Sequence, residues 1–240
     1  KLLAVVNNSA DTQSVVYDVE AGTNPTGWTT LTANTKARFV TFLDSVLLIN
    51  GADAESSYNG TTVITTGGAF DLANIPSSNT VDIGIEWRNR VYLAGDTALP
   101  DRLFFSTVIT SAGNITWDPN VDWVDINPND GENITALKRY SLELLILKPN
   151  YIYRFRTTGT DPDPLIKIGT RSQESVIEGK RGLYFHHDSG FFRYTGGYPE
   201  EISRPISDIV DAIPYSQFAS ISAWKDSDHI YWSLRNLTVD

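Results

Sequence analysis

The sequence predicts an all-β protein, a β-propeller of about six blades built from short antiparallel strands. Three observations lead to this prediction. A two-strand unit recurs about every 45 residues, the strands are rich in β-branched and aromatic residues, and Gly, Asn, Asp or Pro closes them.

Each unit of the repeat combines an alternating strand, a tight polar turn and a second, more hydrophobic strand. In one copy the two strands fall at residues 38–43 and 46–50. Units begin at residues 38, 83, 134, 175 and 220, so their separations are 45, 51, 41 and 45 residues. Residues 1–17 fit the tail of an earlier unit, which makes six units with the first and last incomplete. Such a period is typical of propeller blades, each of which buries its faces against its neighbours.

The turns and the second strands support this interpretation. The second strands are apolar on both faces, as in Val46–Ile49 and Leu144–Leu147, which is expected for a strand packed between two blades. A two-sheet β-sandwich repeated twice would have similar turn spacing, but the regular repeat favours the propeller. Residues that tolerate positive φ are expected at Asn50–Gly51, Asn59–Gly60, Gly67–Gly68 and Asp188–Gly190.

The connections between hairpins are of two kinds. Residues 95–106, 111–132 and 157–164 are rich in Asp, Asn and Pro and are predicted to be loops. One short helix is predicted near 205–213, with Ser203 as its N-cap and Pro214 ending it. Its apolar face would comprise Ile206, Ile209, Val210 and Ile213, at i, i+3, i+4 and i+7.

Composition excludes several classes of protein. The formal net charge of -10 argues against a surface that grips phosphates, which needs clustered Lys and Arg. Cysteine is absent, so disulfides, thiolate metal sites and Cys nucleophiles are excluded. No apolar run approaches the roughly 18 residues of a membrane span, and no signal peptide is seen. Five Asn-x-Ser/Thr sequons, at Asn7, Asn59, Asn114, Asn133 and Asn236, are interpreted as chance matches.

Two groups of residues suggest metal binding. The histidines are His186, His187 and His229; adjacent residues on a strand point to opposite faces, so the first two are not expected to share an ion. The acidic stretch has spacings that do not match an EF-hand, which leaves a solvated loop as the prediction and an irregular calcium loop as the alternative. This stretch comprises Asp118, Asp122, Asp125, Asp130 and Glu132.

Catalytic motifs are missing. There is no Gly-rich phosphate loop, no Gly-x-Ser-x-Gly elbow and no zinc motif. Residues 111–117 resemble a sialidase Asp-box only distantly, lack its Asp and occur once. We therefore predict that the protein is not an enzyme, with no catalytic, cofactor-binding or metal-binding residues.

Aromatic residues are frequent on the predicted strands. They could stack on carbohydrate, but packing between blades is the preferred interpretation, because aromatics are natural strand residues. The residues are Trp87, Tyr92, Phe104, Phe105, Trp117, Trp123, Tyr151, Tyr153, Phe155, Phe191, Phe192, Trp224 and Trp232.

A set of short phrases is more specific than the repeat. Residues 88–96 read Arg-Asn-Arg-Val-Tyr-Leu-Ala-Gly-Asp, and 100–106 read Pro-Asp-Arg-Leu-Phe-Phe-Ser. Further phrases lie at 124–131, 144–154 and 202–213. Together they resemble the β-propeller virion proteins of tailed bacteriophages, of the packaged-DNA stabilisation, tail-hub or tail-nozzle type, over roughly residues 80–215.

The resemblance implies a non-enzymatic structural protein of the phage tail or head-to-tail connection, around the DNA exit channel. It implies assembly as a homo-oligomeric ring, usually a hexamer, with other virion proteins (portal, adaptor or tail components) as partners. DNA would touch the channel only transiently, and the protein would reside in the virion, assembled in the bacterial host cytoplasm. Family members usually carry further domains, so residues 1–240 are expected to be a single, incomplete propeller domain of a longer chain.

Two other functions are compatible with the predicted fold. One is a glycan-binding or glycan-cleaving (sialidase-like) propeller involved in receptor recognition. The other is a cellular propeller that acts as an interaction scaffold.

Overall fold

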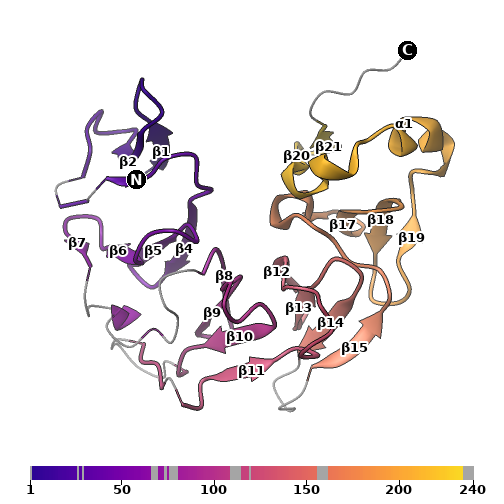
Figure 1. Ribbon diagram of the computed structural model, residues 1–240, viewed down its shortest axis with the longest axis horizontal. Coiled ribbons are helices and arrows are strands. Elements are labelled where there is room, and N and C mark those ends of the chain that lie inside the picture. The colour runs from indigo at the N-terminus through magenta and orange to yellow at the C-terminus, as the bar shows by residue number, and fades with distance from the viewer. Residues whose placement is uncertain are drawn as a thin grey trace. The chain divides into compact units, whose positions relative to one another are not determined.

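The computed structural model describes residues 2–25, 27–28, 30–65, 70–72, 75, 81–108, 115–118, 120–155 and 162–234, apart from the side chains of 164 and 165. The chain is almost entirely β, with six small antiparallel sheets that follow one another in sequence (Figure 1). This confirms the prediction of an all-β, propeller-type fold. Two compact units, Lys1–Asp125 and Ile126–Asp240, are described separately below.

The first unit holds three sheets. The first sheet contains β1 (Leu3–Asn7), β2 (Gln13–Asp18) and β3 (Leu31–Thr32). The second contains β4 (Arg38–Phe42), β5 (Ser45–Ile49), β6 (Ser56–Tyr58) and β7 (Val63–Ile64). The third contains β8 (Ile83–Trp87), β9 (Arg90–Ala94), β10 (Arg102–Phe105) and β11 (Trp123–Asp125).

The second unit also holds three sheets. Its first contains β12 (Ala136–Tyr140), β13 (Glu143–Leu147), β14 (Ile152–Phe155) and β15 (Asp163–Ile166). The next contains β16 (Ile177–Gly179), β17 (Gly182–His187), β18 (Gly190–Tyr194) and β19 (Glu200–Glu201). The last contains β20 (Ser222–Lys225) and β21 (Ile230–Ser233). The helical segments are η3 (Gln173–Ser175), η4 (Arg204–Ile206), α1 (Ser207–Asp211) and η5 (Tyr215–Ser220).

Every sheet is a meander, in which strands pair in the order they occur along the chain. A Greek-key sandwich would instead pass the chain back and forth between two sheets. The observed order therefore rules out the sandwich alternative for the described strands.

Successive sheets pack face to face within a unit. The first strands of neighbouring sheets lie side by side, β4 with β8 and β16 with β20. Gly84 on β8 permits this close approach: a Cβ atom there would lie 2.6 Å from Cγ2 of Val40 and 2.9 Å from Cδ1 of Ile49. The core of the second unit is an equivalent layer, in which Leu145 and Leu147 of β13 share a buried cluster with Leu183 and Phe185 of β17.

The predicted hairpins are present, with shifts at some strand ends: Ser175 and Ser220, predicted to begin strands, lie in η3 and η5, and β16 and β20 begin at Ile177 and Ser222. Strands β8 and β9 have the predicted bounds. In the third unit of the repeat, residues 138–141 were expected to form the turn, but β12 continues through Lys138 to Tyr140. Lys138 pairs with Leu145 and Tyr140 with Glu143, so the ladder extends and the bend falls at Ser141, where φ is 55°.

Three strands were not predicted from the sequence. β10 lies inside the predicted loop 95–106, β11 inside 111–132, and β15 begins inside 157–164. All three strands are short and carry Asp, Arg or Pro; β11 and β15 lie at sheet edges, where such residues guard against pairing with other chains, whereas β10 pairs on both sides. Their polar composition therefore looks like loop composition.

The turn residues follow the expectation where the structure describes them. Gly51, Gly60 and Gly190 have φ values of 72°, 90° and 144°. Residues 67–68 lie outside the described residues. The turn between β8 and β9 uses Arg88 and Asn89 at φ 50° and 59°, without a glycine.

The predicted helix over 205–213 is only partly correct. A 3₁₀ turn, η4, precedes a five-residue helix, α1, so two helical segments replace one continuous helix. Ser203 does not cap through its side chain, because its Oγ accepts a hydrogen bond from the Phe191 N–H at 3.0 Å. Val210 and Ile213 are buried as predicted, whereas Ile206 is exposed.

No helix in the described ranges is long and apolar enough to cross a membrane.

Candidate functional site

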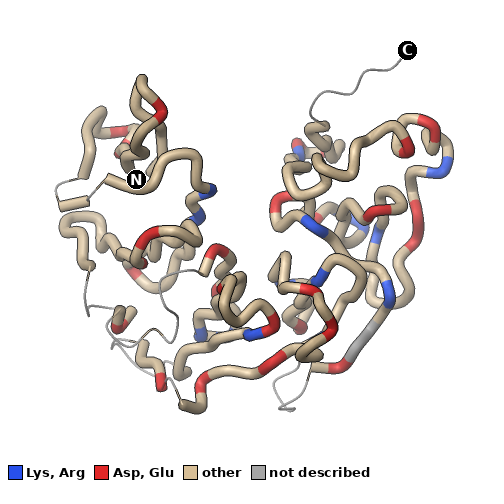
Figure 2. The backbone as a smooth tube through the Cα atoms, in the orientation of Figure 1, with Lys and Arg blue, Asp and Glu red and all other residues tan. Residues whose placement is uncertain are grey.

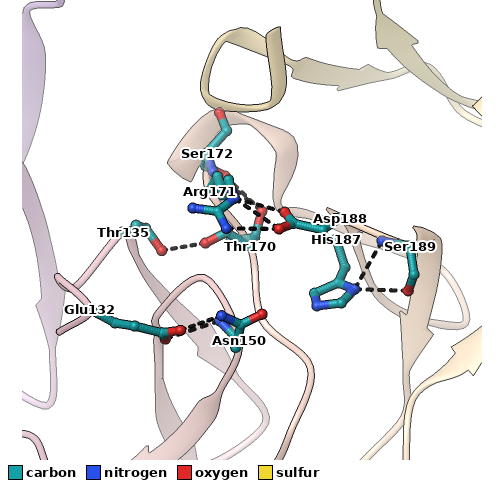
Figure 3. A network of polar contacts seen from close by, with 9 residues as sticks. All are labelled: Glu132, Thr135, Asn150, Thr170, Arg171, Ser172, His187, Asp188 and Ser189. Atoms are coloured by element: carbon teal, nitrogen blue, oxygen red, sulfur yellow. Dashed lines mark hydrogen bonds and ion pairs between the residues drawn. The ribbon is translucent and has the colours of Figure 1, made fainter. Parts of the chain in front are cut away.

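A polar network in the second unit joins the connections between sheets (Figure 3). Its residues lie just before the first strand of a sheet or just after the second strand. They are Glu132, Thr135, Asn150, Thr170, Arg171, Ser172, His187, Asp188 and Ser189.

The connection between β15 and β16 lies against the preceding sheet. The Thr170 N–H donates to the Lys148 carbonyl at 3.0 Å, and the Thr135 hydroxyl donates to the Thr170 carbonyl. A Cβ atom on Gly169 would lie 1.9 Å from the Lys148 carbonyl oxygen, so only glycine fits there. The Gln173 side chain completes the contact, accepting from the Leu137 N–H at 2.7 Å and donating to its carbonyl at 3.1 Å.

The same connection is attached to the next sheet by Arg171. Its guanidinium binds the Asp188 carboxylate through Nε at 2.8 Å and Nη2 at 2.7 Å, and its Cζ lies 4.6 Å from the centre of the Tyr215 ring. The hydrogen bonds to Asp188 raise the pKa of Arg171. This bidentate pair positions the connection between β15 and β16.

In the sheet β12–β15 a buried ion pair occupies the position that corresponds to the Arg171–Asp188 pair. Lys148, which follows β13, is fully buried, and its Nζ lies 2.9 Å from both carboxylate oxygens of Asp130. Burial would raise the pKa of Asp130, but hydrogen bonds from Lys148, the Glu132 N–H and Asn127 outweigh it and hold the pKa below its usual value. In the first unit a neutral pair fills the same place, with Asn50 Nδ2 donating to Thr35 at 3.1 Å.

Three sheets therefore share one device, which we call the clasp. The residue after the second strand binds the segment before the first strand of the same sheet. The clasp pairs are Asn50–Thr35, Lys148–Asp130 and Asp188–Arg171.

The histidines do not converge. His186 is buried against the rings of Phe191 and Phe218, whose centroids lie 5.0 and 4.8 Å from its own. His187 lies on the opposite face, where its Nδ1 accepts from the Ser189 N–H at 3.2 Å. His229 is in the turn after β20. Among the described residues no three His, Asp or Glu gather in a way that could hold a metal ion.

Burial controls the ionisation of His186. Desolvation lowers its pKa to about 4, an effect that Asp188 opposes and His187 reinforces. Nε2 of His186 is buried without a hydrogen-bond partner in the described structure. Its imidazole therefore acts as a neutral core ring at neutral pH.

The acidic stretch is divided among separate partners. Asp122 accepts from the Asp118 N–H at 2.7 Å, and Arg102 binds Asp125 at 2.8 Å while lying 3.6 Å from the Trp123 ring centre. Asp130 binds Lys148, and Glu132 binds Asn150. These carboxylates support loops and strands, so the arrangement does not favour the calcium alternative.

Two sequons and the Asp-box-like stretch also have structural roles. Asn7 accepts from the Ser14 hydroxyl at 2.6 Å, and Asn59 accepts from the Thr62 N–H at 2.8 Å. Trp117 is buried and donates to the Phe70 carbonyl at 2.7 Å. Asn114, Asn236 and the rest of 111–114 lie outside the described residues.

Most of the strand aromatics pack between sheets, as predicted. Trp87, Tyr92, Phe104, Trp117, Tyr153, Phe191 and Phe192 are buried. Trp224 is the exception: it is 52% exposed and stacks on the exposed Tyr231, with centroids 5.2 Å apart and an interplanar angle of 13°.

A groove of about 760 Å³ lies between the sheet β16–β19 and the hairpin β20–β21. Tyr184, Ile202, Ile230 and Trp232 form its apolar lining. Its polar lining comprises Lys180, Arg181, Lys225, Asp226, Asp228 and His229. Sequence reasoning missed this groove, because its walls come from turns about 45 residues apart in the chain.

No family model matches the sequence, and no curated protein matches it significantly. Solved structures resemble it in fold. One is the extracellular domain of the putative one component system BT4673 from B. thetaiotaomicron, with 15% identity, a TM-score of 0.60, and 97% of this chain and 30% of that chain covered. Another, the extracellular domain of the putative hybrid two component system BT4673, has 14% identity, a TM-score of 0.57 and the same coverage. At this identity the likeness concerns the fold alone, and the chain spans less than a third of these proteins.

The buried Lys148–Asp130 clasp predicts that Lys148→Met strongly lowers the stability of the folded protein. Removal of the cation leaves the mostly buried Asp130 carboxylate unpaired, so the free energy of unfolding in urea should fall by about 3 kcal/mol. The double variant Lys148→Met/Asp130→Asn should recover part of this loss. Lys180→Met, which breaks an exposed pair with Asp228, should change little. Equal effects of the two lysine changes would contradict the assignment.

The burial of His186 predicts a pH dependence of stability. In the unfolded chain the His186 imidazole is protonated below its ordinary pKa of 6.5. In the folded chain it stays neutral down to about pH 4, because burial lowers its pKa. Stability should therefore fall between pH 6.5 and 4, by about 3 kcal/mol from this residue. His186→Leu should lack that component when urea unfolding is followed across the range. Parallel curves for the two proteins would refute the prediction.

Proposed function

We propose that the chain is a non-enzymatic structural component of a phage virion, in the tail or head-to-tail connection around the DNA exit channel. The observation that carries the proposal is that polar residues in the phrases that resemble phage propeller proteins form structural contacts within the sheets and loops. Arg102 binds Asp125, and Asp130 binds Lys148. Residues of these phrases serve to hold sheets and loops in place, as expected of a rigid building part.

The charge of the chain supports the same proposal. Asp and Glu are spread through both units and outnumber Lys and Arg by 29 to 19 (Figure 2). An acidic surface does not release counterions from DNA, so DNA would pass without being held. Other virion proteins and further copies of the chain, in a ring of about six, would be the lasting partners.

The proposal predicts that the protein is present in purified phage particles. Mass spectrometry of particles purified on a density gradient should detect it at several copies per particle, and cryo-EM should place propeller density at the tail or connector. The portal protein of the same particles is the internal standard for copy number. Particles that carry the portal but lack this chain would overturn the proposal.

One observation favours a second candidate, a glycan-binding propeller for receptor recognition. The stacked pair Trp224 and Tyr231 presents an exposed aromatic surface on one face of the β20–β21 hairpin. Exposed aromatic patches of this kind mark binding surfaces.

This candidate predicts binding to host-surface polysaccharide that Trp224→Ala reduces by about tenfold or more, measured by calorimetry, because the change removes the stacking surface. Tyr198→Ala, at another exposed aromatic, is the matched control. Hydrolysis that a carboxylate change abolishes would extend the candidate to cleavage. Failure of all polysaccharides tested to bind would exclude it.

A further inference from the structure

The sequence contains two Asn-Gly pairs, and both follow a strand of the sheet β4–β7. Asn50–Gly51 follows β5, and Asn59–Gly60 follows β6. In such a pair the asparagine side chain can be attacked by the next backbone nitrogen, because glycine has no side chain to hinder the close approach of its backbone. The two pairs therefore share one potential reaction, and the structure decides which of them can undergo it.

The side-chain carbonyl groups of the two asparagines are bound in the same way. Oδ1 of Asn50 accepts from the N–H groups two and three residues further along the chain, at 3.1 and 2.9 Å. Oδ1 of Asn59 accepts from its corresponding N–H groups at 3.0 and 2.8 Å. Negative charge would develop on Oδ1 during attack at Cγ, and donors in these positions would stabilise it. This feature favours reaction equally at both asparagines.

The amide group of Asn50 is held by the clasp of its sheet. Its Nδ2 donates to Thr35 at 3.1 Å and to Asp53 at 2.6 Å, and the residue is only 6% exposed. The attacking nitrogen is held as well, since the Gly51 N–H donates to the Val81 carbonyl at 3.1 Å. Attack at Asn50 therefore requires that these contacts open first.

The amide group of Asn59 is not held in this way. Asn59 is exposed, and its Nδ2 has no hydrogen-bond partner among the described residues. Gly60 has a φ of 90°, and a Cβ atom built on it would meet no other atom within 4 Å. The side chain of Asn59 can therefore turn in open space without loss of any contact of its NH₂ group.

We propose that Asn59 is a site of spontaneous deamidation, from which the clasp protects Asn50. Hydroxide removes the proton of the Gly60 nitrogen, which then forms a bond to Cγ of Asn59. The Cγ–Nδ2 bond breaks, and ammonia leaves with a proton from water. The cyclic imide that results adds water and opens at either carbonyl, to aspartate or to isoaspartate. The inference goes beyond the proposed function, because it depends only on the sheet β4–β7.

The products have different effects at the two positions. An aspartate at position 59 keeps the oxygen that accepts from Thr61 and Thr62, so the turn is retained. Isoaspartate adds one methylene to the backbone between β6 and β7 and distorts this turn. An aspartate at position 50 would replace the Nδ2 that donates to Asp53 by a carboxylate oxygen, so that two negative groups meet. Protection of Asn50 therefore preserves its clasp.

The test follows both asparagines in one molecule. The folded 240-residue chain is incubated in mildly alkaline buffer made with heavy-oxygen water, and peptides are mapped by mass spectrometry. Asn59 should gain a heavy-oxygen carboxylate at least about tenfold faster than Asn50, because Asn50 must first leave its clasp. Isoaspartyl methyltransferase should label the peptide that contains residue 59.

Two controls separate the fold from the local sequence. In urea the two Asn-Gly pairs should react at similar rates, since unfolding removes the contacts of Asn50. Thr35→Val should raise the rate at Asn50 about threefold or more without changing the rate at Asn59, because one hydrogen bond to the Asn50 amide is lost. Thr12→Val, which removes the same kind of contact from Asn8, is the matched control. Thermal unfolding checks that each variant is folded.

Three results would overturn the proposal. One is equal reaction of Asn50 and Asn59 in the folded chain, or faster reaction of Asn50. Another is a ratio of the two rates that stays the same in urea, which would assign the difference to sequence alone. The third is the absence of reaction at Asn59 in the folded chain under conditions where it reacts in urea.

Discussion

The clasps of the sheets β12–β15 and β16–β19 are the contacts on which the arrangement of the second unit depends. A meander sheet is a short ribbon that buries its faces only against neighbouring sheets, so the connection between two sheets must be held to both. Thr170 and Arg171 do this within two residues, the first on the sheet of Lys148 and the second on Asp188. Buried backbone groups of the connection are thereby satisfied, which a loop lying over a core requires.

The clasp engages several of the ionisable side chains of the second unit in structural contacts. Lys148 and Asp130 form a pair that would be costly to break, and Arg171 holds Asp188 in two-point geometry. His186 is a neutral ring in an aromatic cluster.

The β20–β21 hairpin is the exposed surface with the most distinctive character. One face presents Trp224 and Tyr231, and the other face packs Trp232 on Phe191 beside the groove.

The sequence alone determined the hairpins and the fold class, because alternation, β-branched residues and turn residues are local signals. The pairs 38–42 with 45–49 and 83–87 with 90–94 follow from such signals. Tertiary structure decided the outer strands, whose guarded composition resembles a loop, and the break between η4 and α1, where Ser203 caps no helix and instead binds β18. It also decided the clasps and the groove. Their partners lie 15 to about 50 residues apart, and only the stacking of sheets brings them together.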